Sequence, residues 1–259
     1  MSALSPAQRR QFQAKGFVVI KGCFSRETAR AWTDKALRRL GCDPADPKTW
    51  TQKSVTAPRS AELEIRTFAP KAWAAICELV GGEDRVERPE LESWLDAFHV
   101  KFPHGTDRGW IAPSSPENTG WHKDGGPDEP HFLDDRRNGL QTFAHFSTVK
   151  PKGGGTFLAV DSVPLVARWL AAHPQGARIT DASFHRLVPA CRKFEELTAE
   201  AGDVALVHPY MIHTESFNCF GEPRFLAIRM IKLAEKMRFD RERARDHSLV
   251  EAVVVKALR

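Results

Sequence analysis

Hydrophobic residues recur at helical spacing through the first third of the chain. A serine stands just before each of the first two such segments, and serine is a preferred helix cap. In the second segment the apolar side chains fall on one face of a helix, at Ala29, Trp32, Ala36 and Leu40. These signals predict helices over 6–15, 26–40 and 71–80, with a strand over 17–20.

From about residue 90 the pattern changes to short apolar runs divided by proline and glycine turns. We expect strands near 94–102, 139–148, 155–160, 184–190, 203–208 and 224–231, and helices near 163–173 and 248–257. Residues 42–60 are rich in Pro, Lys, Thr and Ser and are interpreted as a loop. Many short strands behind a helical section predict a mainly β, α+β fold, an antiparallel barrel or jelly roll buttressed by helices. We expect one domain over 1–259, with helical support at 1–90, a β core at 91–232 and a helical tail at 233–259.

Composition and charge narrow the function classes. With 42% hydrophobic and 27% charged residues, the chain can bury a sizeable core. The net charge of +5 is spread along the sequence, so we expect no nucleic-acid partner, which would need a clustered basic stripe. The five cysteines are scattered without a Cys-x-x-Cys pair, which predicts neither disulfides nor structural zinc. No apolar stretch reaches membrane-spanning length, so we expect a soluble, cytoplasmic protein without a membrane partner.

Two segments carry candidate metal ligands. His122 and Asp124 are separated by one residue, which on an extended segment places both side chains on one face and Lys123 on the other. Chance explains most lone His-x-Asp motifs, but a further histidine, His213, follows a downstream β segment. Two imidazoles and one carboxylate are the ligand set of non-haem Fe(II) oxygenases. The sequence therefore predicts an iron site.

An arginine follows the distal histidine by eleven positions. We interpret His213 as the end of one hairpin strand and Arg224 as the start of the next, which brings the arginine into the cavity that the histidine lines. A guanidinium binds a carboxylate bidentately, so this arginine suits a carboxylate co-substrate. Arg229 lies on the other face of the same strand and competes for the role. We prefer an ion-paired position on the outer face for Arg229.

The order of these motifs resembles a known family. Residues 4–12, 16–20 and 24–27, then His122-x-Asp124, Thr156 to Ser162, Gly202-Asp203, His213, Asn218 and Arg224, follow the pattern of the phytanoyl-CoA dioxygenase-like Fe(II)/2-oxoglutarate oxygenases. The resemblance implies a double-stranded β-helix, also called a cupin-like barrel, with His122, Asp124 and His213 on Fe(II). It also implies that Arg224 binds the distal carboxylate of 2-oxoglutarate and that O2 is consumed.

Three departures from the family pattern set this chain apart. Glu215 stands where relatives often have a small hydroxyl residue, two positions after the distal histidine. Gly154 to Phe157 replaces an Asn-Gly-x-Leu segment, and Val160 to Val163 replaces a Pro-Gly-Ser-His-like segment. These departures suggest a subgroup distinct from the enzyme that gives the family its name.

Further residues are candidates for the walls of the site. Gln141 and Thr156 are candidate donors to 2-oxoglutarate, because a β-helix lines its cavity from several strands. Candidate substrate-lining residues are Trp110, Trp121 and His145, each with ordinary core packing as the alternative. The loops 104–119 and 127–138 flank the ligand pair and are the natural lid and substrate-selecting segments.

Taken together, the sequence predicts an Fe(II)- and 2-oxoglutarate-dependent dioxygenase. We expect it to hydroxylate a small metabolite or lipid-like molecule and to release succinate and CO2. Related halogenases lack the carboxylate that Asp124 supplies, so hydroxylation, desaturation or ring formation is expected instead. Two alternatives stay open. One is a cupin-like hydrolase or isomerase using another metal, and the other is a non-catalytic binding member of the same fold. The sequence does not indicate the oligomeric state.

Overall fold

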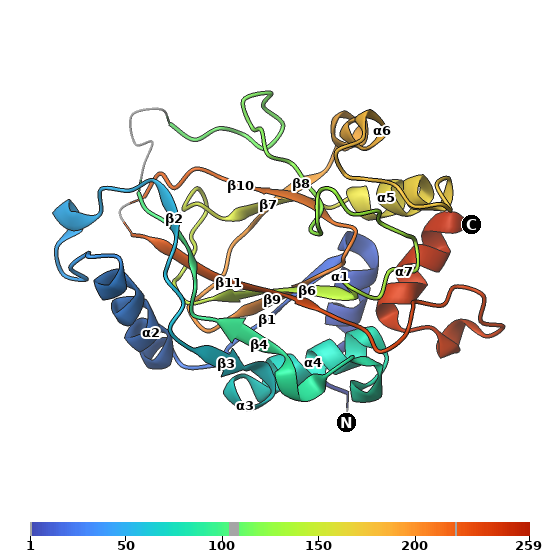
Figure 1. Cartoon of the computed structure of the whole chain (residues 1–259), viewed down its shortest axis with the longest axis horizontal. Coiled ribbons are helices and arrows are strands. Elements are labelled where there is room, and N and C mark those ends of the chain that lie inside the picture. Colours follow the sequence, from blue (N-terminus) through green and yellow to red (C-terminus); the bar gives the residue numbers. More distant parts are fainter. Residues whose placement is uncertain (1, 104–108, 221) are drawn as a thin grey trace.

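The helices of the N-terminal segment begin and end where their capping residues predict. The computed structural model describes residues 2–103, 109–220 and 222–259 (Figure 1). The Ser5 side chain accepts a hydrogen bond from Gln8 N, and the Gln8 side chain accepts one from Ser5 N. Gly16, at φ 72°, ends this first helix in the left-handed conformation that glycine adopts without strain. The helices are α1 (Pro6–Lys15), α2 (Arg26–Arg39), α3 (Ile65–Phe68), α4 (Pro70–Val80), α5 (Ser162–Ala171), α6 (Ala182–His185) and α7 (Leu249–Leu258).

The strands form a mixed α/β architecture in which all the sheets are antiparallel. A six-stranded sheet has the order β1-β9-β6-β11-β5-β2, a three-stranded sheet has the order β10-β7-β8, and β3 pairs with β4. The strands are β1 (Phe17–Ile20), β2 (Ser54–Thr56), β3 (Glu62–Glu64), β4 (Ser93–Leu95), β5 (His99–Lys101), β6 (Leu140–His145), β7 (Thr156–Ala159), β8 (Phe194–Leu197), β9 (Val204–Val207), β10 (Ile212–Glu215) and β11 (Arg224–Ile231).

The two larger sheets lie one above the other. In Figure 1 the three-stranded sheet is above the six-stranded sheet, and α3 and α4 are below it. Helix α7 packs against α1, α4 and α5. Helices α3 and α4 lie on the lower side of the six-stranded sheet, and its upper face is toward the other sheet (Figure 1).

An aromatic cluster fills the space on the helical side. Phe146 packs against Phe98 and Phe24 at ring-centroid distances of 4.6 and 4.7 Å. Trp94 is fully buried, and its indole N–H donates to Thr142 Oγ1 at 2.8 Å. Because Thr142 alternates with its neighbours on β6, this cluster marks the face of the sheet that points away from the site. Burial of large rings on one face holds the sheet while the opposite face stays available to line a cavity.

Three element predictions differ from the structure. Residues 184–190 are not a strand: α6 and a 3₁₀ turn at Val188–Ala190 occupy them, and the strand is β8. Proline fixes a backbone angle suited to that turn and cannot donate to a sheet. The predicted strand over 94–102 is divided into β4 and β5, because the intervening Asp96 accepts hydrogen bonds from Ser60 and Ala61. The expected loop at 42–60 contains β2.

The predicted hairpin between the distal histidine and the arginine is also wrong. Strand β10 pairs with β7, whereas β11 pairs with β5 and β6 in the other sheet.

Residues 104–108 of the expected lid lie outside the described residues. Within the described part of the chain, no helix has the length and apolar character needed to cross a membrane.

Candidate metal centre

Two chain segments meet to form the candidate metal centre. His213 lies on β10, and the segment that carries His122 runs antiparallel beside it. His122 N donates to His213 O at 3.0 Å, and His213 N donates to His122 O at 2.9 Å. Residues paired in this way project their side chains to the same face, and the two imidazole centroids are 4.4 Å apart.

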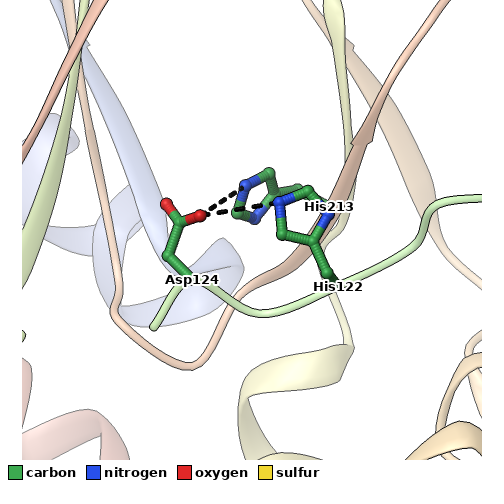
Figure 2. A group of neighbouring side chains, drawn as sticks. All are labelled: His122, Asp124 and His213. Atoms are coloured by element: carbon green, nitrogen blue, oxygen red, sulfur yellow. Dashed lines mark ion pairs between the residues drawn. The ribbon is translucent and has the colours of Figure 1, made fainter. Parts of the chain in front are cut away.

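Asp124 completes a group of three potential ligands. Its Oδ1 lies 3.5 Å from His122 Nε2 and 3.7 Å from His213 Nε2 (Figure 2). The three ligand atoms all lie within 4.8 Å of one another. Metal–ligand bonds of about 2.1 Å at right angles place neighbouring donor atoms about 3 Å apart. A contraction of roughly half an ångström, which side-chain rotation can supply, would bring the carboxylate to that spacing from each imidazole.

The remaining polar atoms of the three side chains support this arrangement. His122 Nδ1 hydrogen-bonds to Gly120 O at 2.7 Å, and His213 Nδ1 to Met211 O at 3.1 Å. A backbone carbonyl accepts from N–H, so in both rings the proton belongs on Nδ1 and the lone pair on Nε2 faces the shared point. Within the described residues, Asp124 Oδ2 is buried without a hydrogen-bond partner. The donor set therefore fits a divalent cation.

The surroundings of Asp124 and His213 favour the forms of these two side chains that bind metal. Burial raises the pKa of Asp124, but the two imidazoles outweigh it and hold the pKa below its usual value. The hydrogen bond to Asp124 raises the pKa of His122, whereas burial lowers the pKa of His213. An ionised carboxylate thus stands beside a neutral imidazole at His213.

A cavity of about 550 Å³ opens in front of the three ligands. Its walls come from both sheets: Thr156, His213 and Glu215 from the three-stranded sheet, and Phe143, Arg224, Leu226 and Ile228 from the six-stranded sheet. Ser54, His99, Met230 and Lys232 complete the rim, with Arg229. Small-molecule sites commonly measure about 300–1,000 Å³. The metal centre therefore lies in the wall of a cavity between the sheets.

The two candidate arginines differ in their partners. The Arg224 side chain is only 4% exposed, and its Nη2 lies 3.5 Å from Glu215 Oε2. Its Nε has no hydrogen-bond partner among the residues described. Arg229 also borders the cavity, but its Nε donates to the buried carboxylate of Glu92 at 2.6 Å. Arg224 thus keeps free donors in the cavity, while Arg229 is held by an ion pair.

The structure places the candidate co-substrate donors on the inner faces of the two sheets. Thr156 lines the cavity directly. Gln141 and His145 share the face of β6 that carries Phe143, and both are buried. Within the described chain, the side-chain amide of Gln141 and both ring nitrogens of His145 have no partner. Burial and then the charge of Arg224 lower the pKa of His145 to about 3, which keeps this imidazole neutral.

The two candidate tryptophans lie away from the cavity. Alternation along the segment that carries His122 turns Trp121 to the opposite side, where its ring packs against Phe194 at 5.3 Å. Trp110 packs edge-on against Phe157 at 6.1 Å, and Phe157 points away from its neighbour Thr156. Both indoles thus cover the outer face of the three-stranded sheet, and neither is among the residues that line the cavity.

Lys123 points away from the metal ligands, as alternation predicts, but it is buried. Its Nζ donates to Asp124 O at 2.9 Å and lies 3.2 Å from His131 Nδ1. Burial lowers the pKa of this ammonium group to about 8. A second cavity of about 270 Å³ adjoins it.

Sequence reasoning missed Ser54, which lines the cavity, and Lys101, which lies beside Arg224. Both are paired with neighbouring strands, since Ser54 is opposite Lys101 and Lys101 is opposite Arg224. The alternating His99-x-Lys101 pattern was the available signal. It was obscured because β2 looks like a loop and the β4–β5 region looks like one long strand.

Comparisons with known proteins place the fold. No family model matches the chain, and no curated protein matches it. The hypothetical protein JW0805 from Escherichia coli is similar in structure, with a TM-score of 0.56 and 16% identity over 90% of this chain and 69% of that one. The non-haem α-ketoglutarate-dependent carbocyclase SnoK from nogalamycin biosynthesis has a TM-score of 0.51 and 17% identity, over 90% of this chain and 86% of its own.

A second enzyme of nogalamycin biosynthesis is also similar. The non-haem α-ketoglutarate-dependent epimerase SnoN has a TM-score of 0.51 and 14% identity over 87% of this chain and 80% of its own. At these identities the likeness establishes a shared fold. The chemistry has to be argued from the residues of this chain.

Proposed function

We propose that this protein is an Fe(II)- and 2-oxoglutarate-dependent oxygenase with a double-stranded β-helix fold. One observation carries the proposal. A face of two imidazoles and one carboxylate shares a cavity with a buried arginine whose donors are largely free. Such a ligand face suits non-haem iron, and a guanidinium fork suits a carboxylate. SnoK and SnoN, which share the fold, are described as α-ketoglutarate-dependent non-haem enzymes, and this supports the same assignment.

The residues of the chain divide the work of binding. His122, Asp124 and His213 would hold the iron on one face and leave its other positions open to ligands. Arg224 would bind the far carboxylate of 2-oxoglutarate, which would give its buried guanidinium closer hydrogen bonds than the 3.5 Å contact with Glu215. Thr156, which is opposite Glu215 on the neighbouring strand, lines the same cavity and can donate a hydrogen bond. Iron with 2-oxoglutarate and O2 supplies the oxidising chemistry when bound.

Apolar side chains shield the reacting region from water. Phe143 lies beside His213, with ring centroids 5.5 Å apart, and Leu226 and Ile228 continue the same wall. Met230 is 37% exposed at the rim. We propose that the substrate is a small molecule whose apolar part contacts this wall, because the cavity has room beyond the co-substrate.

We propose hydroxylation as the reaction, with formation of succinate and CO2 from 2-oxoglutarate. Asp124 supports this choice, because it occupies the position that must be vacant for a halide ligand. Ring formation and epimerisation are the activities named for SnoK and SnoN. Identification of the substrate product would separate these outcomes.

The test is succinate formation by anaerobically purified protein supplied with Fe(II), ascorbate, 2-oxoglutarate and O2. We expect slow succinate release without substrate and faster release with it. Asp124→Ala should lose bound iron and activity, while Asp128→Ala, an exposed carboxylate nearby, should keep both. No succinate from the wild type, or full iron binding by Asp124→Ala, would overturn the proposal. A different resident metal without oxygen consumption would favour a cupin-like hydrolase or isomerase.

A further inference from the structure

Two cations lie side by side where Arg224 and Glu215 line the cavity. Lys101 on β5 is directly opposite Arg224 on β11, so their side chains project to the same face. Their side chains are 12% and 4% exposed. Like charges directly opposite each other in a sheet destabilise it. The pair therefore requires a nearby anion.

Glu215, from the other sheet, supplies that anion. Its Oε1 lies 3.0 Å from Lys101 Nζ, and its Oε2 lies 3.5 Å from Arg224 Nη2. The contact with Lys101 is a normal ion pair, whereas the contact with Arg224 is at the limit of a hydrogen bond. The Glu215 side chain is half exposed at the end of β10. The carboxylate is thus the accessible member of the group, and the two cations form its buried base.

The arginine is left with unmet hydrogen-bonding capacity. A guanidinium has five N–H donors, yet Arg224 has only the long contact with Glu215 among its described side-chain partners, and its Nε is buried without any. An ion this deeply buried is costly unless it is fully paired. A second carboxylate, or a better-placed one, would satisfy it.

We propose that Lys101 and Arg224 together form the binding site for the far carboxylate of a dicarboxylic acid, and that Glu215 fills this site until the acid displaces it. This inference rests on the proposed function, because 2-oxoglutarate is the acid in question. The site then selects for a ligand carboxylate that binds both cations better than Glu215 does. The acid cannot bind while Glu215 occupies the site. The apparent affinity for the acid is therefore the intrinsic affinity multiplied by the fraction of time that the site is free.

Glutarate tests the site without the metal. It has the same two carboxylates but lacks the keto group, so it cannot chelate a metal as a 2-oxo acid does. Calorimetric titration of metal-free protein in EDTA measures its dissociation constant. We expect Glu215→Gln and Glu215→Ser to bind glutarate about tenfold more tightly than the wild type, as displacement of a competitor predicts. Lys101→Met should weaken binding roughly tenfold or more, because a charged hydrogen bond is lost.

One control variant and two contrary results test the role of Glu215. Glu242→Gln removes an exposed carboxylate elsewhere and should leave the dissociation constant unchanged. Unchanged or weaker glutarate binding in both Glu215 variants would show that Glu215 holds Arg224 in place, and this would overturn the inference. No glutarate binding by any variant at millimolar concentrations would overturn it as well.

A parallel titration of Ni(II)-loaded protein with 2-oxoglutarate separates this inference from the proposed function. In one outcome the wild type binds glutarate as expected, but Ni(II) does not increase its affinity for 2-oxoglutarate and no succinate forms. The proposed function then fails, whereas the dicarboxylate site stands. If succinate forms but the Glu215 variants lose affinity, the proposed function stands and the displacement fails.

Discussion

Binding of a divalent metal should raise the melting temperature of this protein measurably. The candidate ligands come from two segments. His122 and Asp124 lie on the segment before β6, and His213 lies on β10. The two segments are joined by one pair of backbone hydrogen bonds and by the hydrogen bond that Thr214 Oγ1 donates to Thr119 O. A metal bound to all three side chains would join the segments only in the folded state, and a ligand that binds only the folded state stabilises it.

The size of the effect follows from the geometry and from mass action. The separations of 3.5 and 3.7 Å from Asp124 to the two imidazoles need only a small contraction, so little binding energy is lost to rearrangement. At a metal concentration one hundred times the dissociation constant, the stabilisation is about 2.7 kcal/mol. In a chain of this size, 1 kcal/mol shifts the melting temperature by roughly 2–4 °C. We therefore expect a rise of about 5–10 °C.

Thermal unfolding followed by fluorescence, with Ni(II) or Mn(II) in place of oxidisable Fe(II), measures this shift. EDTA should reverse it. If Asp124→Ala weakens binding about one hundredfold, the remaining stabilisation at the same metal concentration is about 0.4 kcal/mol, or roughly 1–2 °C. Asp128→Ala should behave as the wild type. Equal shifts in Asp124→Ala and the wild type would refute the reasoning, since the metal would then be bound elsewhere, for example by other histidines.

Three further predictions concern other parts of the molecule. Arg224→Met should weaken 2-oxoglutarate binding by about 3 kcal/mol without loss of metal, whereas Arg229→Met should mainly lower stability; calorimetry separates them. Asp96→Asn should cost about 3 kcal/mol of unfolding free energy at neutral pH. Burial raises the pKa of Asp96, but its hydrogen bonds and Arg39 lower it overall, so in urea titrations the difference from wild type should shrink as pH falls from about 4 toward that lowered pKa. Gly202→Ala should destabilise the fold, because the new methyl group meets the backbone of Phe24 at φ 96°.

Local signals in the sequence predicted most of the elements and the grouping of three candidate metal ligands. A helix cap such as Ser5, or a ligand pair such as His122 and Asp124, is defined by residues within a few positions of one another. Its geometry therefore follows from the period of a helix or an extended segment. The opposite directions of Arg224 and Arg229, and of Lys123 and the two candidate ligands beside it, follow from the same alternation.

Pairing between distant strands could not be predicted in this way. The tryptophans were assigned to the cavity because large apolar side chains suit a substrate wall, yet alternation does not say which face of a strand meets the other sheet. Lys101 was missed for the same reason, since its importance depends on its register with Arg224. Glu215 was recognised as unusual from the family pattern, but its two cationic partners became visible only with the strands paired.

His213 and Arg224 lie in different sheets and not on the two strands of one hairpin. Neighbouring strands of one hairpin lie about 5 Å apart, whereas facing sheets lie about 10 Å apart. His213 and Arg224 belong to different sheets and both line the cavity between them. A hairpin would have brought the guanidinium beside the metal ligands, with no room for a molecule between them. Because β10 and β11 belong to different sheets, Arg224 and the candidate metal ligands line the cavity from opposite sides, as the proposed binding of a five-carbon diacid between them requires.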